Sequence, residues 1–388
     1  MKLKQYPRDF IVEEISSIVP STDKDNYCIF LLEKEEMDTF EALRYISKKW
    51  QIPTNEIGYA GLKDKHALTK QWISVPSQCD ANPFHKNRIR TQFIGYCNDK
   101  IKIGELLGNR FLINVRDIKK DQIESIQNRL NEIKKTGVLN YFDSQRFGSV
   151  IKQNFIAKSI LQGDIETAVK WFLTLYQKSE SRYIKNDKRL ILSNWSNLST
   201  LSINDYRLKA VVDEYLKTKD WLASYKKIPV RLRELIKNAY QSYLWNKCIM
   251  KILNDLISTK DLFSVKYAAG ILLFFRDIPP KIFLKFPEEF PTISHNMNSS
   301  NEESSVINEI ISQENISFED LKDYEKTGTY FSTHLRKVLV TPKNLRKSPF
   351  DKDMVNSIGN QSCFKVELNF ELPKGSYATI VTKSIFGH

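Results

Sequence analysis

The sequence contains few cysteines and histidines, and neither kind is clustered. Its 388 residues include five of each, and the cysteines lie far apart at positions 28, 79, 97, 248 and 363. No pair has the short spacing of a zinc site, so we expect no metal site and no disulfide framework. Scattered, reduced cysteines are typical of cytoplasmic proteins.

Long apolar runs are also missing. The run ILLFF (271–275) is far shorter than the ~20 residues of a membrane span. The first ten residues, MKLKQYPRDF, lack the apolar core of a signal peptide. We therefore expect a soluble protein of the cytoplasm, with no membrane association.

Positive charge is present in excess. The chain has 59 Lys and Arg against 46 Asp and Glu, a formal net charge of +13 that is spread along the sequence. Such an excess suits a folded protein that binds a polyanion across a broad face, although a lysine-rich surface without a partner fits the charge equally well. With 41% hydrophobic and 12% aromatic residues, the chain is expected to be globular, and its length favours two domains.

The two ends of the chain are predicted to be rich in strands. Asp38 and Glu41 form a plausible capping box for a helix that ends near Trp50, and helical spacing predicts a second helix over 121–137, ended by Gly137. β-Branched and aromatic residues predict strands at 10–15, 27–33, 71–75, 91–96, 109–117 and 363–372, with a turn at 373–376 and a return strand at 377–385.

The middle of the chain is more helical. Helical periods dominate residues 155–260, most clearly over 231–256, where an aromatic stripe is more typical of core packing than of a ligand site. Residues 294–319 are rich in Ser, Asn and Glu and are predicted to be a flexible loop. This order predicts an α+β fold in which a more helical insertion interrupts a sheet domain.

The stretch GYAGLKDKHALTKQW (58–72) places Asp64 between Lys63 and Lys65 on a loop broken by glycines. A Walker-type phosphate loop would need a Gly-Lys-Ser/Thr ending, which does not follow Gly61. A surface ion pair between Asp64 and a neighbouring lysine is the simplest alternative, and it would contribute only ~0–1 kcal/mol. The stretch alone does not decide between an ion pair and a catalytic carboxylate.

A second stretch, GVLNYFDSQRFG (137–148), sets aromatic residues beside an amide and a guanidinium. Side chains such as Phe142, Asn140 and Arg146 can stack on a base, bond its edge and hold a phosphate. A strand and turn in a core, with Arg146 paired to Asp143, is the alternative interpretation.

Five stretches in the same order together resemble the signature motifs of the TruD family of pseudouridine synthases. They run from residue 7 to residue 379, so the resemblance covers nearly the whole chain. The stretches are PRDFIVEEI (7–15), GYAGLKDKHALTKQW (58–72), NYFDSQRFG (140–148), NAYQSYLWN (238–246) and LPKGSYAT (372–379).

The resemblance implies an enzyme that converts uridine to pseudouridine, typically uridine 13 of transfer RNA, without a metal or an organic cofactor. Other structured RNA is an alternative substrate, and no obligate protein partner is evident. It implies a pseudouridine synthase catalytic domain with a mixed or antiparallel sheet at 1–157 plus 341–388. A more helical α+β insertion domain would occupy 158–340.

By the same resemblance Asp64 is the catalytic residue. A carboxylate can attack C1′ or take a proton from the sugar, and the residues leave both routes open. Asn140 would read the uracil edge, and Phe10 and Tyr377 would wall the pocket. Phe142 would pack on the flipped base, and the basic residues would support Asp64 or hold phosphates. The substrate-binding or RNA-binding residues are expected to be Phe10, Asn140, Phe142, Tyr377, Lys63, Lys65 and Arg146.

Two rival functions belong to other classes. A non-catalytic RNA-binding protein could keep the fold and the charge, and a nucleoside hydrolase would also break a glycosidic bond. Glycosidases usually need two carboxylates across the bond, whereas the motif offers one flanked by lysines, so we rank the hydrolase last.

Overall fold

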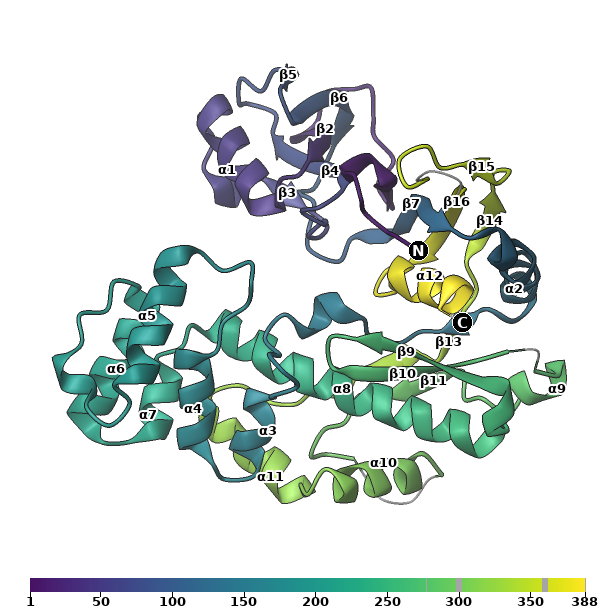
Figure 1. Cartoon of the computed structure of the whole chain (residues 1–388). Helices are drawn as coiled ribbons and strands as arrows, with labels where there is room; N and C mark the ends of the chain where they lie inside the picture. Colours follow the sequence, from purple (N-terminus) through teal and green to yellow (C-terminus); the bar gives the residue numbers. More distant parts are fainter. Residues whose placement is uncertain (277, 298–301, 358–361, 388) are drawn as a thin grey trace. The chain divides into compact units, whose positions relative to one another are not determined.

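The computed structural model describes residues 1–276, 278–297, 302–357 and 362–387, and it divides into two compact units (Figure 1). The sheet unit comprises Met1–Val138 with Val340–Phe386, and the helical unit comprises Leu139–Leu339. The α+β class is as predicted. Residues 139–157 belong to the helical unit, because they pack on the helices that follow them. The sequence had assigned these residues to the catalytic domain.

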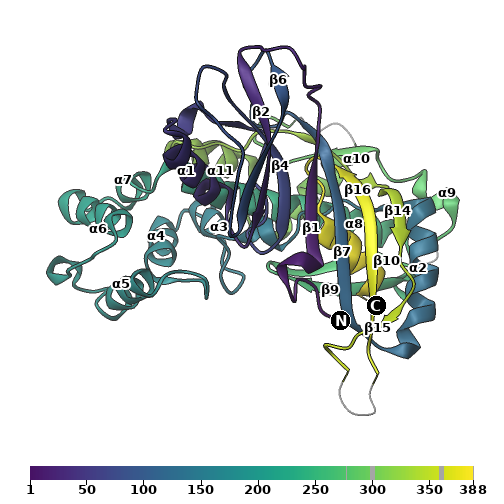
Figure 2. The ribbon, with the colours of Figure 1, turned by 90° about the horizontal axis from the view of Figure 1, so that it is seen from above.

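The described part of the sheet unit contains one mixed ten-stranded sheet, with strand order β14-β16-β7-β1-β4-β2-β6-β5 and with β15 and β3 paired to β16 and β4. Figure 2 shows β1, β7, β16 and β14 side by side. The strands are β1 (Phe10–Ser16), β2 (Tyr27–Glu35), β3 (Gly58–Tyr59), β4 (Leu68–Pro76), β5 (Phe84–Lys86), β6 (Ile89–Cys97), β7 (Leu106–Ile118), β14 (Lys343–Lys347), β15 (Asp351–Lys352) and β16 (Phe364–Pro373).

One parallel pair at the centre of this sheet positions the candidate catalytic loop. Strands β1 and β4 run parallel, with Ile11 opposite Leu68 and Val12 opposite Thr69. The loop between β3 and β4 therefore enters β4 beside the start of β1. Residues before Leu68, including Asp64, are brought to the end of the sheet where Phe10 begins β1.

Among the residues that the structure describes, three α-helices cover the sheet unit, namely α1 (Thr39–Trp50), α2 (Ile123–Thr136) and α12 (Ala378–Phe386). The predicted start of α1 is confirmed, because the Asp38 side chain accepts a hydrogen bond from the Glu41 amide. Leu43, Ile46 and Trp50 of α1 are buried in one core with residues of β2, β4 and β6. Each predicted strand except the one at 377–385 overlaps a strand of this sheet, and the helix that ends at Gly137 is also present.

The prediction of a return strand at 377–385 is wrong, because this segment forms helix α12. Nearly all of its side chains are buried, including Ile380, Val381 and Ile385. Burial on most sides removes the alternation that distinguishes a strand, and packing overrides the modest helix penalty of β-branched residues. The Arg129 guanidinium on α2 donates to the Ser384 carbonyl at 2.9 Å and to its hydroxyl at 2.9 Å, which ties the two helices together.

The helical unit is built around the long helix α8, which Figure 1 shows beside α3, α10 and β10. Tyr240, Leu244 and Trp245 of α8 are buried, so the aromatic stripe is core, as predicted. Within the described ranges, no helix is both long and apolar enough to cross a membrane. The elements are β8 (Val138–Leu139), α3 (Ile156–Leu161), α4 (Ile165–Thr174), α5 (Arg182–Ser193), α6 (Tyr206–Thr218), α7 (Trp221–Lys226), α8 (Val230–Leu256), β9 (Leu262–Tyr267), β10 (Gly270–Phe275), α9 (Pro280–Phe283), β11 (Glu289–Pro291), α10 (Glu302–Gln313), α11 (Phe318–Asp323), β12 (Leu335–Lys337) and β13 (Leu339–Val340).

The predicted loop at 294–319 is largely helical instead. Helix α10 spans Glu302–Gln313, and Ile307, Ile310 and Ile311 on it are buried. These isoleucines recur at helical spacing and bury one face, which outweighs the polar composition of the segment. Residues 298–301, which belong to the same prediction, lie outside the described residues.

Candidate active site

The loop that carries Asp64 is held by hydrogen bonds to its main chain. Lys34 on β2 has no exposed surface, and its ammonium donates to the Asp64 carbonyl at 2.9 Å and to the Met37 carbonyl at 2.6 Å. The Lys63 amide donates to the Thr39 hydroxyl at 3.0 Å. The side-chain amide of Gln71 donates to the Gly61 carbonyl at 3.2 Å. Buried residues of three elements therefore fix the main chain of the loop from Gly61 to Asp64.

The two glycines of the motif have different roles. A Cβ atom on Gly58 would lie 2.3 Å from the Ser74 Oγ and 2.7 Å from the Ile101 carbonyl oxygen, whereas Gly61 has open space. The Ser74 hydroxyl in turn accepts a hydrogen bond from the Ile101 amide at 2.9 Å. Gly58 is therefore required by a close approach of the chain, and Gly61 is not.

The Asp64 carboxylate forms an ion pair with a lysine that the sequence did not single out. The Lys4 ammonium lies 2.8 Å from the Asp64 Oδ2, and the two side chains are 24% and 23% exposed. The same ammonium lies 4.0 Å from the centroid of the Phe10 ring. Lys4, Asp64 and Phe10 form a partly open cluster in which a cation faces both a carboxylate and an aromatic ring.

The lysines that flank Asp64 lie in different surroundings. The Lys63 ammonium lies 2.5 Å from the Glu14 Oε2, and both side chains are almost fully buried. Lys65 is exposed to solvent. Lys63 therefore belongs to an interior ion pair, which disfavours a direct contact with RNA, while Lys65 is accessible to a phosphate.

Burial changes the protonation of Lys34. The pKa of its ammonium is lowered from 10.5 to about 8, chiefly because burial penalises the charged form, and the Asp64 charge opposes this effect. The site therefore contains a cation whose charge is sensitive to pH slightly above neutrality. It acts on the main chain of Asp64 through the hydrogen bond already described.

The two aromatic residues predicted to wall the pocket are placed differently. Phe10 is 2% exposed and packs edge-on against Phe111, with ring centroids 6.2 Å apart. Tyr377 is partly exposed on the short segment that leads from β16 into α12. Phe10 therefore has the burial expected of core, although Lys4 lies against its ring.

In the helical unit, Asn140 is held tightly by its surroundings. Its side-chain amide donates to the Lys337 carbonyl at 3.1 Å, and its Oδ1 accepts from the Arg336 guanidinium at 3.0 Å. The Arg336 guanidinium also donates to the Asn140 main-chain carbonyl at 2.9 and 2.6 Å. These bonds fix the orientation of an amide that is 6% exposed.

The main chain of Phe142 is held by a clamp, namely two hydrogen bonds to the Asn246 side chain, and its ring lies close to two guanidinium groups. Its amide donates to the Asn246 Oδ1 at 2.9 Å, and its carbonyl accepts from the Asn246 Nδ2 at 2.9 Å. The Phe142 ring meets Trp245 edge-on at 5.5 Å, with the Arg336 guanidinium 4.0 Å and the Arg146 guanidinium 5.5 Å from its centroid. The Arg146 Nε also donates to the Ser242 hydroxyl at 3.0 Å.

The predicted residues thus fall into two groups, one in each unit. The sheet unit holds Phe10, Lys63, Asp64, Lys65 and Tyr377, and the helical unit holds Asn140, Phe142 and Arg146. Sequence reasoning missed Lys4, Lys34, Asn246 and Arg336. Two of these lie in or near quoted motifs: Asn246 ends NAYQSYLWN and Lys4 lies six residues before Phe10.

Across the part of the chain that the structure describes, no group of three or more His, Cys, Asp and Glu side chains is arranged to hold a metal ion. The chemistry that the site offers is that of a partly open carboxylate beside an ammonium group and an aromatic ring. Such a carboxylate is suited to nucleophilic or proton-transfer chemistry.

Comparison with known proteins identifies the family. The model of the family "tRNA pseudouridine synthase D (TruD)" matches residues 1–265 and 289–385. A Methanocaldococcus jannaschii protein described as "Probable tRNA pseudouridine synthase D 2" is 37% identical, over 100% of this chain and 92% of that protein. The "tRNA pseudouridine synthase D" of Aquifex aeolicus is 29% identical, over 100% and 98%.

Solved structures agree with the sequence comparisons. A crystal structure from Methanosarcina mazei, described as "Putative tRNA pseudouridine synthase D (TruD)", superposes with a TM-score of 0.73 at 25% identity. The alignment covers 100% of this chain and 93% of that one. With a family match over most of its length and relatives matched end to end, this chain belongs to the TruD family of tRNA pseudouridine synthases.

Proposed function

We propose that this protein converts uridine to pseudouridine in transfer RNA, at position 13, in the cytoplasm, with Asp64 as the catalytic residue. The observation that carries the assignment of Asp64 is its partly exposed carboxylate, held 2.8 Å from the Lys4 ammonium on a loop whose main chain is fixed. The family membership supports the reaction, and the net charge of +13 supports a polyanionic substrate.

The reaction breaks the N1–C1′ bond of uridine and forms a C5–C1′ bond, after which the proton on C5 is lost and N1 carries a proton. Asp64 would take part while the base is detached, either by attacking C1′ or by removing a proton from the sugar. Both roles need an ionised carboxylate, and the Lys4 ammonium lies 2.8 Å from the Asp64 Oδ2. The fixed main chain would keep the carboxylate in position during the rearrangement.

The target uridine has to leave its stack to reach Asp64, at a cost of a few kcal/mol. Phe10 would support the flipped base once Lys4 moves off its ring, and Tyr377 would provide a second wall. Asn140 would present its amide to the uracil edge, in an orientation that Arg336 fixes. Phe142 would pack on the flipped base, while Lys65 and Arg146 would hold RNA phosphates.

The test is release of tritium from transfer RNA labelled at C5 of uridine, because the isomerisation replaces that hydrogen. The Asp64→Asn variant keeps the shape of the side chain and should release none, while still binding transfer RNA. Asp121→Asn changes an exposed aspartate in the turn that precedes α2 and is the matched control, with release at the normal rate. Normal release by Asp64→Asn would show that another group performs the chemistry.

The same assay separates the rivals and tests the position. A non-catalytic RNA-binding protein would retain all the tritium, and a nucleoside hydrolase would liberate free uracil. A transfer RNA with cytidine at position 13 should give no product if the proposed target is correct. Continued release from that RNA would place the target elsewhere.

A further inference from the structure

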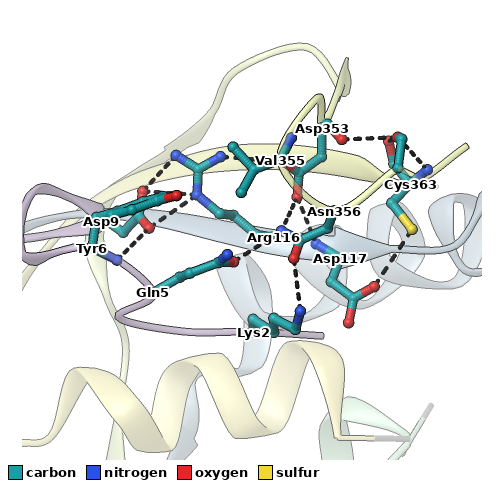
Figure 3. Close-up of polar contacts among 11 residues, drawn as sticks. Lys2, Gln5, Tyr6, Asp9, Arg116, Asp117, Asp353, Val355, Asn356 and Cys363 are labelled. Atoms are coloured by element: carbon teal, nitrogen blue, oxygen red, sulfur yellow. Dashed lines mark hydrogen bonds and ion pairs between the residues drawn. The ribbon is translucent and has the colours of Figure 1, made fainter.

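A network of charged and amide side chains holds residues 2–9 against the end of β7 (Figure 3). The main chains of Lys2 and Arg116 pair as an isolated bridge, with N–H···O distances of 2.8 and 3.0 Å. The Tyr6 amide donates to the Asp9 carboxylate at 3.0 Å. This segment is therefore anchored on both sides of Lys4.

Arg116 is the hub of the network. Its guanidinium binds the Asp9 carboxylate in a bidentate manner at 2.8 to 3.0 Å and reaches the Asp353 Oδ1 at 3.3 Å. Asp9 is 2% exposed and Asp353 is 0% exposed. Bidentate arginine–carboxylate pairs have a defined geometry as well as energy, so the hub fixes the direction of the chain between Tyr6 and β1.

The segment that follows β15 grips the chain on both sides of Lys4. The Asn356 Oδ1 accepts from the Lys2 ammonium at 2.7 Å, and its Nδ2 donates to the Gln5 Oε1 at 2.9 Å. The same Nδ2 donates to the Asp353 Oδ2 at 2.7 Å. Figure 3 shows Asn356 between Lys2, Gln5 and Asp353, so one amide bridges the flanks of Lys4 to the buried hub.

Lys4 adopts a conformation that its neighbours must impose. Its φ is 55°, in the left-handed region, which costs a residue with a side chain ~1–2 kcal/mol. In this conformation the Lys4 ammonium reaches the Asp64 carboxylate, 60 residues away in the sequence. The anchors on Lys2 and Gln5 thus hold a strained residue whose side chain ends at the candidate reaction centre.

We propose that Asn356 and Asp353 are positioning residues that act on the reaction through Lys4, although neither touches Asp64 in the contacts described above. The inference rests on the proposed function, because its consequence is the orientation of the cation beside the catalytic carboxylate. Loss of the Asn356 bridge lets the Lys4 segment relax, and the Asp64 carboxylate then loses a fixed partner.

The test uses Asn356→Ala, which removes the bridge and leaves the Arg116–Asp9 pair in place. We expect kcat for tritium release to fall on the order of tenfold, with little change in KM for transfer RNA. Met354→Ala, at a side chain 77% exposed in the same segment, should change neither quantity.

A double variant separates positioning from general stability. Lys4→Ala should lower kcat as Asn356→Ala does, and Asn356→Ala should add nothing in the Lys4→Ala background, since its effect passes through Lys4. An equal loss of kcat in both backgrounds, or no loss in the single variant, would overturn the proposal.

An activity-independent measurement keeps the inference distinct from the proposed function. Labelling with an amine-reactive ester, followed by mass spectrometry, should modify Lys4 faster in Asn356→Ala than in the wild type or Met354→Ala. Unchanged labelling would refute the positioning role even in an active enzyme. Absence of tritium release by the wild-type protein would instead refute the proposed function.

Discussion

The buried ammonium of Lys34 makes stability depend on pH in a way that one substitution can isolate. Lys34→Met keeps the length and most of the volume of the side chain but removes the titrating group. The wild-type pKa of Lys34 is lowered from 10.5 to about 8 by burial. The rest of the chain is the same in both proteins, so the informative quantity is the difference between them.

The sign follows from proton binding in the two states. Below pH 8 the Lys34 ammonium is charged in both states, and its burial penalises the folded one. Between pH 8 and 10.5 the folded protein has released a proton that the unfolded chain still holds, so the free energy of unfolding rises with pH. The full shift corresponds to about 3 kcal/mol, and allowing for solvent screening we expect about 2 kcal/mol.

Urea unfolding of both proteins at pH 7 and pH 10 measures this difference. Because the chain has two units, unfolding should be followed locally, by hydrogen exchange of peptides from β2 after a labelling pulse at one common pH. The wild type should gain about 2 kcal/mol relative to Lys34→Met as the pH rises. A difference that is independent of pH would refute the assignment of a lowered pKa to Lys34.

Two further substitutions test the local packing. Gly58→Ala would place a Cβ 2.3 Å from the Ser74 Oγ and should lower the free energy of unfolding by about 2 kcal/mol, whereas Gly61→Ala should change it by less than about 0.5 kcal/mol; equal urea midpoints for the two would contradict the close-approach argument. Asn246→Leu would leave the buried N–H and C=O groups of Phe142 without their Asn246 partner and should cost on the order of 2–4 kcal/mol, seen as a lower melting temperature. An unchanged melting temperature would show that the clamp contributes nothing.

Much of the sheet unit could be predicted because its elements have simple patterns. Strands β1, β2, β4, β6 and β7 contain the predicted ranges, β16 begins one residue after the predicted start at 363, and α1 starts at the predicted cap. The C-terminal helix α12 could not be predicted, because Ile380 and Val381 are buried together with almost all of their neighbours. A segment that is buried on all sides has no hydrophobic periodicity that would distinguish a helix from a strand. The prediction of a loop at α10 was wrong for a related reason. A few buried isoleucines stabilise this helix although the composition of the segment is polar.

The candidate site was predicted by motif rather than by its contacts. The resemblance located Asp64, but the ion pair with Lys4 joins residues 60 positions apart, and no local pattern encodes such a distance. The burial of Lys34 was not predicted for a different reason. A lysine near the end of a predicted strand is expected on the surface, yet this one is buried because main-chain carbonyls satisfy its ammonium.

The ion pairs and hydrogen bonds of the site determine which of its lysines are able to contact RNA. Lys63 is committed to Glu14 inside the protein, and Lys34 is committed to main-chain carbonyls, so neither can follow an RNA phosphate without breaking buried contacts. The Lys4 side chain can move although the main chain on either side of it is anchored, because this side chain is partly exposed. A base that stacks on Phe10 has to displace the Lys4 ammonium from that ring. Substrate entry is therefore coupled to the ion pair between Lys4 and Asp64 through one side chain.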